Sequence, residues 1–348
     1  MPKTRLLYLG VIIGVILFLF IGCGGGGPTP NGGTPTPTPA PTALTIHVPG
    51  NYATIQAAID AANDGDTIIV SAGTYRENLI ISKRIILQGA DPAHPELTVI
   101  DAGANGKDGI RIENAAVTIK SFTITNVVDD LTSSGSAIYI FGGGEVTIDG
   151  NIIENNKTKH AAINFSGMSG NNDTPLIINN IIRNNEYYAS TVNGGSGIYI
   201  SGGNAQVRNN TISGNKSSFG GGIWVNYGYA TIEDNIISGN DATNDGGGIN
   251  VHQSEVTIKN NTITKNHATY SGGGINLLSS TAKIFGNTIS DNTADDTSSK
   301  GGGIRAYVEA SILDQNGNSW PAEDKSGLNG LYQDNTFFNN QPNDLEFY

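Results

Sequence analysis

Residues 244–266, NDGGGINVHQSEVTIKNNTITKN, contain the pattern that decides the fold. Three consecutive glycines precede short runs in which apolar residues alternate with polar ones, INV, VTI and TIT, and five asparagines separate these runs. Such alternation is typical of strands with one buried face. Because Gly and Asn tolerate left-handed backbone conformations, we expect tight turns between the strands. A three-residue strand is unstable alone, so its partners must come from other parts of the chain.

The same order of residues recurs from residue 110 onward. Isoleucines that follow a Gly or Ala cluster are spaced 25 to 35 residues apart, a period typical of solenoids. Equivalent strands of successive units can pair about 4.8 Å apart and bury a shared core that no single unit contains. These inward-facing isoleucines are Ile110, Ile138, Ile163, Ile198, Ile223, Ile249, Ile275 and Ile304.

Each unit ends in the pattern N-[IT]-[IF]-x-x-N, which occurs seven times between residues 151 and 340. In a stack of units, its first and last asparagines form two columns. An amide in such a column can donate to one neighbour and accept from the other, so we predict asparagine ladders with a structural role. The two columns are Asn151, Asn180, Asn210, Asn235, Asn261 and Asn287, and Asn156, Asn185, Asn215, Asn240, Asn266 and Asn292.

The two ends of the stack need covers. Ile55, Ile59 and Ala62 have helical spacing, which predicts a short amphipathic capping helix at about residues 53–63. The repeat breaks off after residue 313, so a C-terminal cap is expected at about 314–348.

The stretch TIQAAIDAANDGDTIIVSAGTYREN, residues 54–78, followed by Asn-rich and Gly-rich repeats, resembles the right-handed parallel β-helix (pectate-lyase-like) superfamily. The resemblance covers about residues 46–340. It implies an all-β fold, a single-stranded right-handed parallel β-helix of about ten coils. It does not specify an activity, because this scaffold carries lyases, esterases, hydrolases and binding proteins.

The first 22 residues read as a signal peptide, with a basic start and a 17-residue apolar run. LFIGC at 19–23 resembles the lipobox of bacterial lipoproteins, which implies lipidation of Cys23 and an extracytoplasmic protein anchored to a bacterial membrane. An uncleaved signal anchor is the alternative. Residues 23–43 are rich in Gly and Thr-Pro and are expected to form a linker, so residues 44–348 form the predicted β-helix domain.

The composition narrows the range of partners. The net charge of -12 disfavours nucleic acid, whose recognition depends on Lys and Arg. An anionic polysaccharide would need bridging cations for the same reason. Cys23 is the single cysteine, so no disulfide framework is possible. We therefore expect a monomer whose membrane contact is the lipid anchor.

The residues one and three positions after each inward isoleucine should form two outward columns. Tyrosine, tryptophan, amide and arginine side chains gather there, a mixture suited to the ring faces and hydroxyls of sugars. The main prediction is that this face binds polysaccharide, a cell-surface glycan or another extended partner. The predicted binding residues are Tyr139, Tyr199, Trp224, Asn226, Tyr227, Asn250, His252, Asn276, Arg305 and Tyr307.

Two other functions stay open. A calcium-dependent polysaccharide lyase, or a related glycan-modifying enzyme, would use Arg305 or His252 as the proton-abstracting group. Calcium is the only cofactor considered, because acidic turns could supply its oxygen ligands. The third possibility is a non-catalytic adhesin or structural spacer. The candidate calcium ligands are Asp241, Asp245, Asp295 and Asp296.

Overall fold

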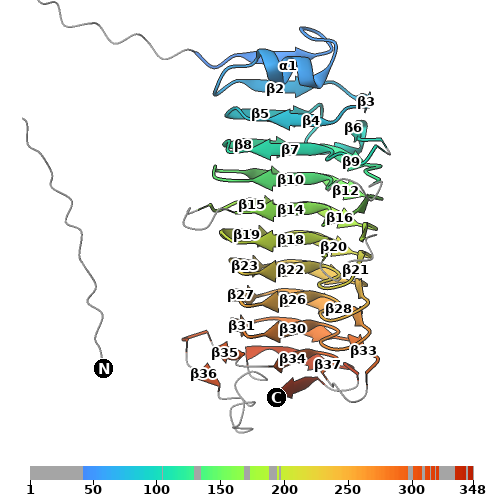
Figure 1. Cartoon of the computed structure of the whole chain (residues 1–348), viewed down its shortest axis with the longest axis vertical. Coiled ribbons are helices and arrows are strands. Elements are labelled where there is room, and N and C mark those ends of the chain that lie inside the picture. The colour runs from blue at the N-terminus through green and yellow to red at the C-terminus, as the bar shows by residue number, and fades with distance from the viewer. Residues whose placement is uncertain are drawn as a thin grey trace, which may run out of the picture. The chain divides into compact units, whose positions relative to one another are not determined.

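The computed structural model describes residues 42–348, apart from 104, 129–134, 168–172, 188–193, 196, 297–300, 308–309, 314, 318, 321–333, 342–343 and 348. Residues 43–348 form one compact unit, in which successive coils stack along a single axis (Figure 1). Each coil contributes short strands to four parallel sheets, named A to D here. The sequence predicted this solenoid, and the ten strands in each of sheets B and C correspond to the expected ten coils.

Sheet A has 12 strands, and its final pair, β35 with β36, is antiparallel. Its inward side chains are aliphatic, as in β8, where Val117 and Ile119 are buried. The strands are β1 (Thr45–Val48), β2 (Thr67–Val70), β5 (Ile85–Gly89), β8 (Val117–Lys120), β11 (Thr147–Asp149), β15 (Leu176–Ile178), β19 (Asn204–Arg208), β23 (Tyr229–Glu233), β27 (Glu255–Lys259), β31 (Thr281–Phe285), β35 (Ser311–Leu313) and β36 (Ser319–Trp320).

Sheet B follows sheet A in each coil. Its three-residue strands bury the middle residue in most coils, for example Ile212 and Ile237. The strands are β3 (Gly73–Tyr75), β6 (Thr98–Asp101), β9 (Thr123–Thr125), β12 (Ile152–Glu154), β16 (Ile181–Arg183), β20 (Thr211–Ser213), β24 (Ile236–Ser238), β28 (Thr262–Thr264), β32 (Thr288–Ser290) and β37 (Thr336–Phe338).

Sheet C bears the predicted functional face, and the small sheet D precedes it in the central coils. Sheet C contains β4 (Leu79–Ile81), β7 (Ile110–Glu113), β10 (Ile138–Phe141), β14 (Ile163–Ser166), β18 (Ile198–Ser201), β22 (Ile223–Asn226), β26 (Ile249–His252), β30 (Ile275–Leu278), β34 (Ile304–Tyr307) and β38 (Leu345–Phe347). Sheet D contains β13 (Lys157–Thr158), β17 (Glu186–Tyr187), β21 (Lys216–Ser217), β25 (Asp241–Ala242), β29 (His267–Ala268) and β33 (Thr293–Ala294).

The core is a set of columns of like residues. In sheet C, Ile138 pairs with Ile163, and Ile163 pairs with Ile198. All three are fully buried. Burying one such side chain stabilises the fold by roughly 1.5–3 kcal/mol, so stacking in register supplies the core that single strands lack.

Both predicted asparagine ladders are confirmed. Each Nδ2 donates to the Oδ1 of the asparagine one coil further along, at 2.9–3.1 Å. All twelve also donate to a main-chain carbonyl of the preceding coil, as Asn215 Nδ2 does to Ile182 O (3.0 Å). The ladders continue to Asn335 and Asn340, where the carboxylate of Asp344 accepts the last amide (2.8 Å).

The N-terminal coil is covered by α1 (Ile55–Ala61), as the helical spacing predicts. Thr54 caps the helix by accepting from Ala57 N, and Ile55 and Ile59 are buried beneath it. The second helical element, η1 (Pro95–Leu97), is a single 3-10 turn. At the other end, strands β37 and β38 lie inside the range predicted as a cap, and they continue sheets B and C.

The predicted signal peptide and nearly all of the predicted linker lie outside the described residues, as do 314, 318, 321–333, 342–343 and 348 of the predicted C-terminal cap. Within the described part of the chain, no helix is long and apolar enough to cross a membrane.

Candidate functional site

The outer face of sheet C gathers the predicted binding residues in register. Tyr139, Asn164, Tyr199, Trp224 and Asn250 follow one another on adjacent strands from β10 to β26. The column continues through Asn276 to Arg305. A second column includes Asn226, His252 and Tyr307. Sequence periodicity therefore placed these side chains on the correct flank of the solenoid.

Part of this column is closed to solvent, which corrects the expectation that Trp224, Asn250 and Asn276 are available to a ligand. Their exposed fractions are 5%, 3% and 2%. The glycine turn that precedes each of these strands folds over the outer side of the strand. At Gly246 the approach is so close that an added Cβ would lie 2.6 Å from the Cβ of Asn250. Asn276 Nδ2 also donates to Asn250 Oδ1 (2.8 Å). These amides serve the fold in this structure.

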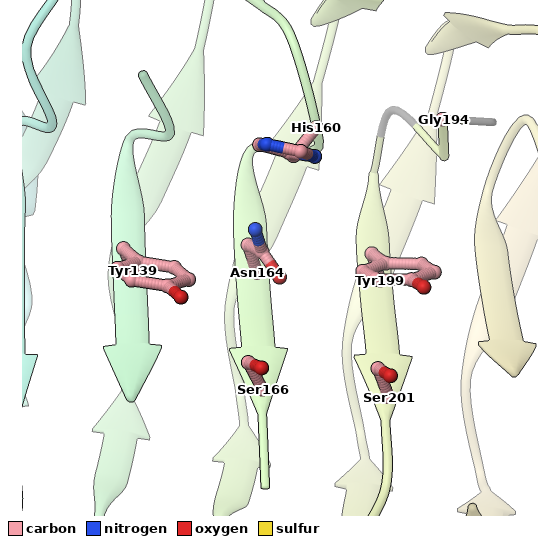
Figure 2. A pocket seen from close by; sticks show the side chains of 7 residues that line it. All are labelled: Tyr139, His160, Asn164, Ser166, Gly194, Tyr199 and Ser201. Carbon is pink, nitrogen blue, oxygen red and sulfur yellow. The ribbon is translucent and has the colours of Figure 1, made fainter. Parts of the chain in front are cut away.

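An open pocket of about 300 Å³ lies further toward the N-terminus on the same face. Tyr139 on β10 and Tyr199 on β18 flank Asn164 on the intervening strand β14 (Figure 2). Figure 2 shows the two tyrosines projecting in the same direction from their strands. This tyrosine pocket is lined by Tyr139, His160, Asn164, Ser166, Gly194, Tyr199 and Ser201.

Each tyrosine of the pocket is supported on the side away from Asn164. The Arg111 guanidinium lies 4.7 Å from the ring centroid of Tyr139. The ring centroids of Tyr199 and Trp224 are 4.9 Å apart, and Phe219 packs on Trp224 at 5.4 Å. Aromatic and cation–π contacts of this kind hold rings in place, so the pocket walls are formed before a ligand arrives.

The pocket has a polar floor. Asn164 is 4% exposed, and its Oδ1 has no hydrogen-bond partner among the described residues. Ser166 and Ser201 place hydroxyl groups at the strand ends beside it (Figure 2). Hydroxyl and amide groups between two aromatic walls can bind a sugar ring through both its faces and its edges.

A second hollow, of about 270 Å³, lies on the neighbouring coils around β4 and β7. Its lining includes Lys107, Asp108 and Arg111. Arg111 donates to Asp108 (3.2 Å) and to Glu113 (2.6 Å). Burial alone would lower the pKa of Arg111, but these two carboxylates outweigh burial and raise it. The guanidinium is therefore a paired support for Tyr139.

The tyrosine pocket connects to β26 through hydrogen bonds. Asn226 Nδ2 donates to the Tyr199 hydroxyl (3.1 Å), and His252 Nδ1 donates to Asn226 Oδ1 (2.8 Å). Burial lowers the pKa of His252 below its usual value, which favours the neutral imidazole. The His252 ring also meets the edge of Tyr227, with centroids 5.4 Å apart.

The second catalytic candidate, Arg305, lies two strands from His252, on β34. Its guanidinium packs on the Tyr307 ring at 4.7 Å. Burial raises the pKa of Asp245, and the nearby Ser271 and Arg305 partly offset that effect. Arg305 is thus engaged with an aromatic ring and an acid.

The four candidate calcium ligands do not share one centre. Asp241 accepts from His267 Nδ1 (2.7 Å) and Asp295 from His267 Nε2 (3.1 Å), whereas Asp245 lies near Arg305. Among the described residues, no group of three or more His, Cys, Asp and Glu side chains is arranged to hold a metal ion. Calcium binding stays a prediction without a described ligand set.

The Asp241–His267–Asp295 contact predicts a pH-dependent contribution to stability. Burial would lower the pKa of His267, but the two carboxylates outweigh burial and raise it. The contribution is therefore fully present below the unfolded pKa of about 6.5 and is lost as the pH rises through the higher folded value. All three side chains are partly exposed, so we expect a change of less than about 1 kcal/mol.

The test compares the unmodified protein with His267→Gln in urea denaturation between about pH 5.5 and pH 8.5. The unmodified protein should have a higher free energy of unfolding than His267→Gln at low pH, and this difference should shrink as the pH rises. A constant difference in unfolding free energy across this range would contradict the prediction.

Five residues of the tyrosine pocket were not among the predicted binding residues: Asn164, His160, Ser166, Ser201 and Gly194. The available signal was the order of side-chain sizes in the outward column, because a small Asn164 stands between two tyrosines once the coils are in register. Gly194 could not be found in this way, because it enters the pocket from a loop rather than from a repeat position.

The family model described as right handed beta helix region matches residues 82–243 and 196–345, most of the chain. The chain belongs to the right-handed β-helix family. This match and the parallel sheets together confirm the predicted fold and its hand. No curated protein matches the chain.

Several solved structures share the β-helix architecture at low identity. Pectate lyase Pel9A is 13% identical, with 77% of this chain and 68% of that chain covered and a TM-score of 0.46. Rice weevil pectin methyl esterase is 13% identical, with 86% and 88% covered and a TM-score of 0.39. The tailspike gp49 from Acinetobacter baumannii bacteriophage Fri1, a capsular polysaccharide depolymerase, is 10% identical, with 88% and 62% covered and a TM-score of 0.38. Likeness at this level concerns the fold alone.

Proposed function

We propose that this protein is a surface-tethered β-helix lipoprotein that binds polysaccharide along the outer face of sheet C, without catalysis of its own. The observation that carries the proposal is the tyrosine pocket, in which Tyr139 and Tyr199 flank the buried amide of Asn164.

The spacing of the pocket suits a sugar ring. The two tyrosines stand two coils apart, which corresponds to roughly 10 Å between their backbones at the usual strand spacing. A pyranose can insert between the rings, stack its apolar faces on both of them, and direct hydroxyls to Ser166 and Ser201. Because each ring is supported from behind, little ordering is needed on binding, and this favours affinity.

The second hollow extends the site along the axis of the solenoid. It lies on the coils before Tyr139 and shares Arg111 with the support of that ring. A row of hollows on one straight face fits an extended polymer better than a compact small molecule. This geometry supports a polysaccharide rather than a free monosaccharide as the partner.

Binding is better supported than a lyase reaction. His252 could accept a proton at Nε2, because its Nδ1 donates to Asn226 Oδ1, and its ring packs against the edge of Tyr227. A lyase also needs a cation or acid beside the substrate carboxylate. No described group of carboxylates stands beside His252 to hold that cation. The adhesin or spacer alternative predicts no affinity for any glycan.

The proposed location follows from the N-terminal sequence. Lipidation of Cys23 would tether the chain outside the cytoplasm, and the linker over 23–43 would hold the binding face away from the membrane. Mass spectrometry of the membrane-associated protein should then find a diacylated N-terminal cysteine.

The function is tested by affinity electrophoresis of the protein in gels that contain xylan, galactomannan, dextran, alginate or polygalacturonate. We expect retardation by at least one neutral polymer, and Tyr199→Ala should weaken it about tenfold, since loss of one stacked ring costs about 1.4 kcal/mol. Tyr270→Ala, which removes a 51% exposed tyrosine outside the pocket, should have no effect. Equal retardation of Tyr199→Ala and the unmodified protein would contradict the proposed site.

A further inference from the structure

A third hollow lies where the chain turns from sheet C into sheet A. This corner groove has a volume of about 310 Å³, and the residues that matter here are Tyr227, Tyr229, Gln253, Glu255, Ser279 and Thr281. It spans the coils of β22, β26 and β30, further toward the C-terminus than the tyrosine pocket. The hollow is polar except for its two tyrosine rings.

Two features of Tyr227 and Tyr229 are unusual for structural residues. Their exposed fractions are 62% and 56%, so most of each ring lies in water. Tyr227 also has a φ of +53°, a left-handed conformation that is rare for a bulky residue. The equivalent corner positions on other coils are Asn114, Gly142, Gly202, Gln253 and Ser279, with φ between 45° and 79°. The left-handed conformation therefore belongs to the corner itself, and Tyr227 differs from its equivalents in placing a bulky, exposed ring there.

The corner groove is joined to the tyrosine pocket by direct contacts. Tyr227 meets the ring of His252, which is bonded through Asn226 to the hydroxyl of Tyr199. A ligand cannot continue straight along the outer face of sheet C beyond Tyr199, because glycine turns bury Trp224, Asn250 and Asn276 on the next three strands. A bound sugar chain that extends from the tyrosine pocket toward the C-terminal coils would therefore follow the exposed surface at the corner groove.

The charges along this route favour a neutral polymer. Glu255 is exposed in the corner groove, and burial favours the neutral form of His252, which packs against Tyr227, by lowering its pKa. Arg111, on the far side of Tyr139, is already paired with Asp108 and Glu113. The chain as a whole carries a net charge of -12. Carboxylates on a sugar chain would be repelled here, whereas hydroxyl groups would find Gln253, Ser279 and Thr281.

We infer that the corner groove is a second sugar-binding subsite, and that a neutral polysaccharide runs from the tyrosine pocket across Asn226 and His252 to Tyr227 and Tyr229. This inference rests on the proposed function and adds the course and the chemical class of the polymer. The two subsites are separated by about three coils, or roughly 14 Å along the axis. A short oligosaccharide fills one subsite, and a longer one reaches both.

The test is isothermal titration calorimetry with xylo-, manno- and cello-oligosaccharides from the disaccharide to the octasaccharide, and with polygalacturonate in calcium-free buffer. The double variant Tyr227→Asn/Tyr229→Thr removes both rings with residues that suit the left-handed turn and the strand. Asn tolerates positive φ, and Thr occupies the equivalent position two coils further on, as Thr281. Tyr270→Ala is the matched control.

We expect the affinity of the unmodified protein to rise with chain length for at least one neutral series. The double variant should keep the disaccharide affinity and lose about tenfold on the longest chain, because only the second contact is removed. If the double variant matches the unmodified protein at every length, or loses disaccharide affinity as well, the second subsite is wrong while the tyrosine pocket stands. Tighter binding of polygalacturonate would overturn the neutral class. Absence of binding by the unmodified protein would overturn the proposed function itself.

Discussion

Asn215→Ala is expected to lower the free energy of unfolding by about 3–5 kcal/mol, because it opens one asparagine ladder in its middle. Asn215 is fully buried, and its Oδ1 accepts from Asn185 N (3.1 Å) and Asn185 Nδ2 (2.9 Å). Its Nδ2 donates to Ile182 O and to Asn240 Oδ1. Alanine leaves several of these buried groups without a partner, and each costs about 1–3 kcal/mol.

The measurement is urea denaturation followed by circular dichroism, with Asn204→Ala as the control. Asn204 is exposed at the start of β19 and belongs to neither ladder, so its replacement should change stability by less than about 0.5 kcal/mol. Hydrogen exchange adds a local test. Because a solenoid is stabilised by neighbour contacts, protection should fall around β17, β21 and β25 before it falls at α1. Equal losses for the two variants would show that the ladder is energetically unimportant.

The ladder also shows why so much of the fold could be predicted from the sequence. In a stack of coils, residues one repeat apart in the sequence lie next to each other on adjacent coils. The repeat pattern therefore predicts which residues are in contact. For this reason Asn215 was predicted to stack on Asn185 of the preceding coil, and Tyr199 on Asn164. Both pairs are in register. The same reasoning placed the aromatic and amide residues on one flank.

Burial on that flank could not be predicted in the same way. Periodicity states that the Trp224 side chain points away from the core, but not that segments outside the strands cover it. The covering backbone includes Gly195 and Gly220, where an added Cβ would lie 3.1 Å and 2.8 Å from the Cβ of Trp224. Those approaches depend on the course of irregular turns, which no repeat pattern records. An outward residue and an exposed residue are therefore different predictions.

The candidate site was predictable only in part for a related reason. Tyr139 and Tyr199 were selected for their chemistry, but the hollow between them is created by the smaller Asn164 and by Gly194. A pocket in a solenoid is a local departure from uniform side-chain size within a column. Two of the candidate calcium ligands, Asp241 and Asp295, accept from His267, and calcium binding stays a prediction.

The cover over the outer column leads to the second large effect, Gly246→Ala, which we expect to cost about 3–4 kcal/mol of unfolding free energy. Gly246 has a φ of +71°, and an added Cβ would lie 2.6 Å from Asn250 Cβ and 2.7 Å from Ile249 O. A methyl group there must push the turn off β26. The matched control is Gly239→Ala, because Gly239 has a φ of +63° with no atom within 4 Å of an added Cβ.

Gly239→Ala should cost only the strain of a left-handed alanine, about 1 kcal/mol. The difference between the two variants in urea denaturation therefore isolates the contact between the glycine turn and the outer column. The result also bears on binding, because the same contact closes the straight route along sheet C and leaves the corner groove as the open one. If both variants lose the same stability, the turn does not press on Asn250. Another contact would then have to close the face at β26, where Asn250 is 3% exposed.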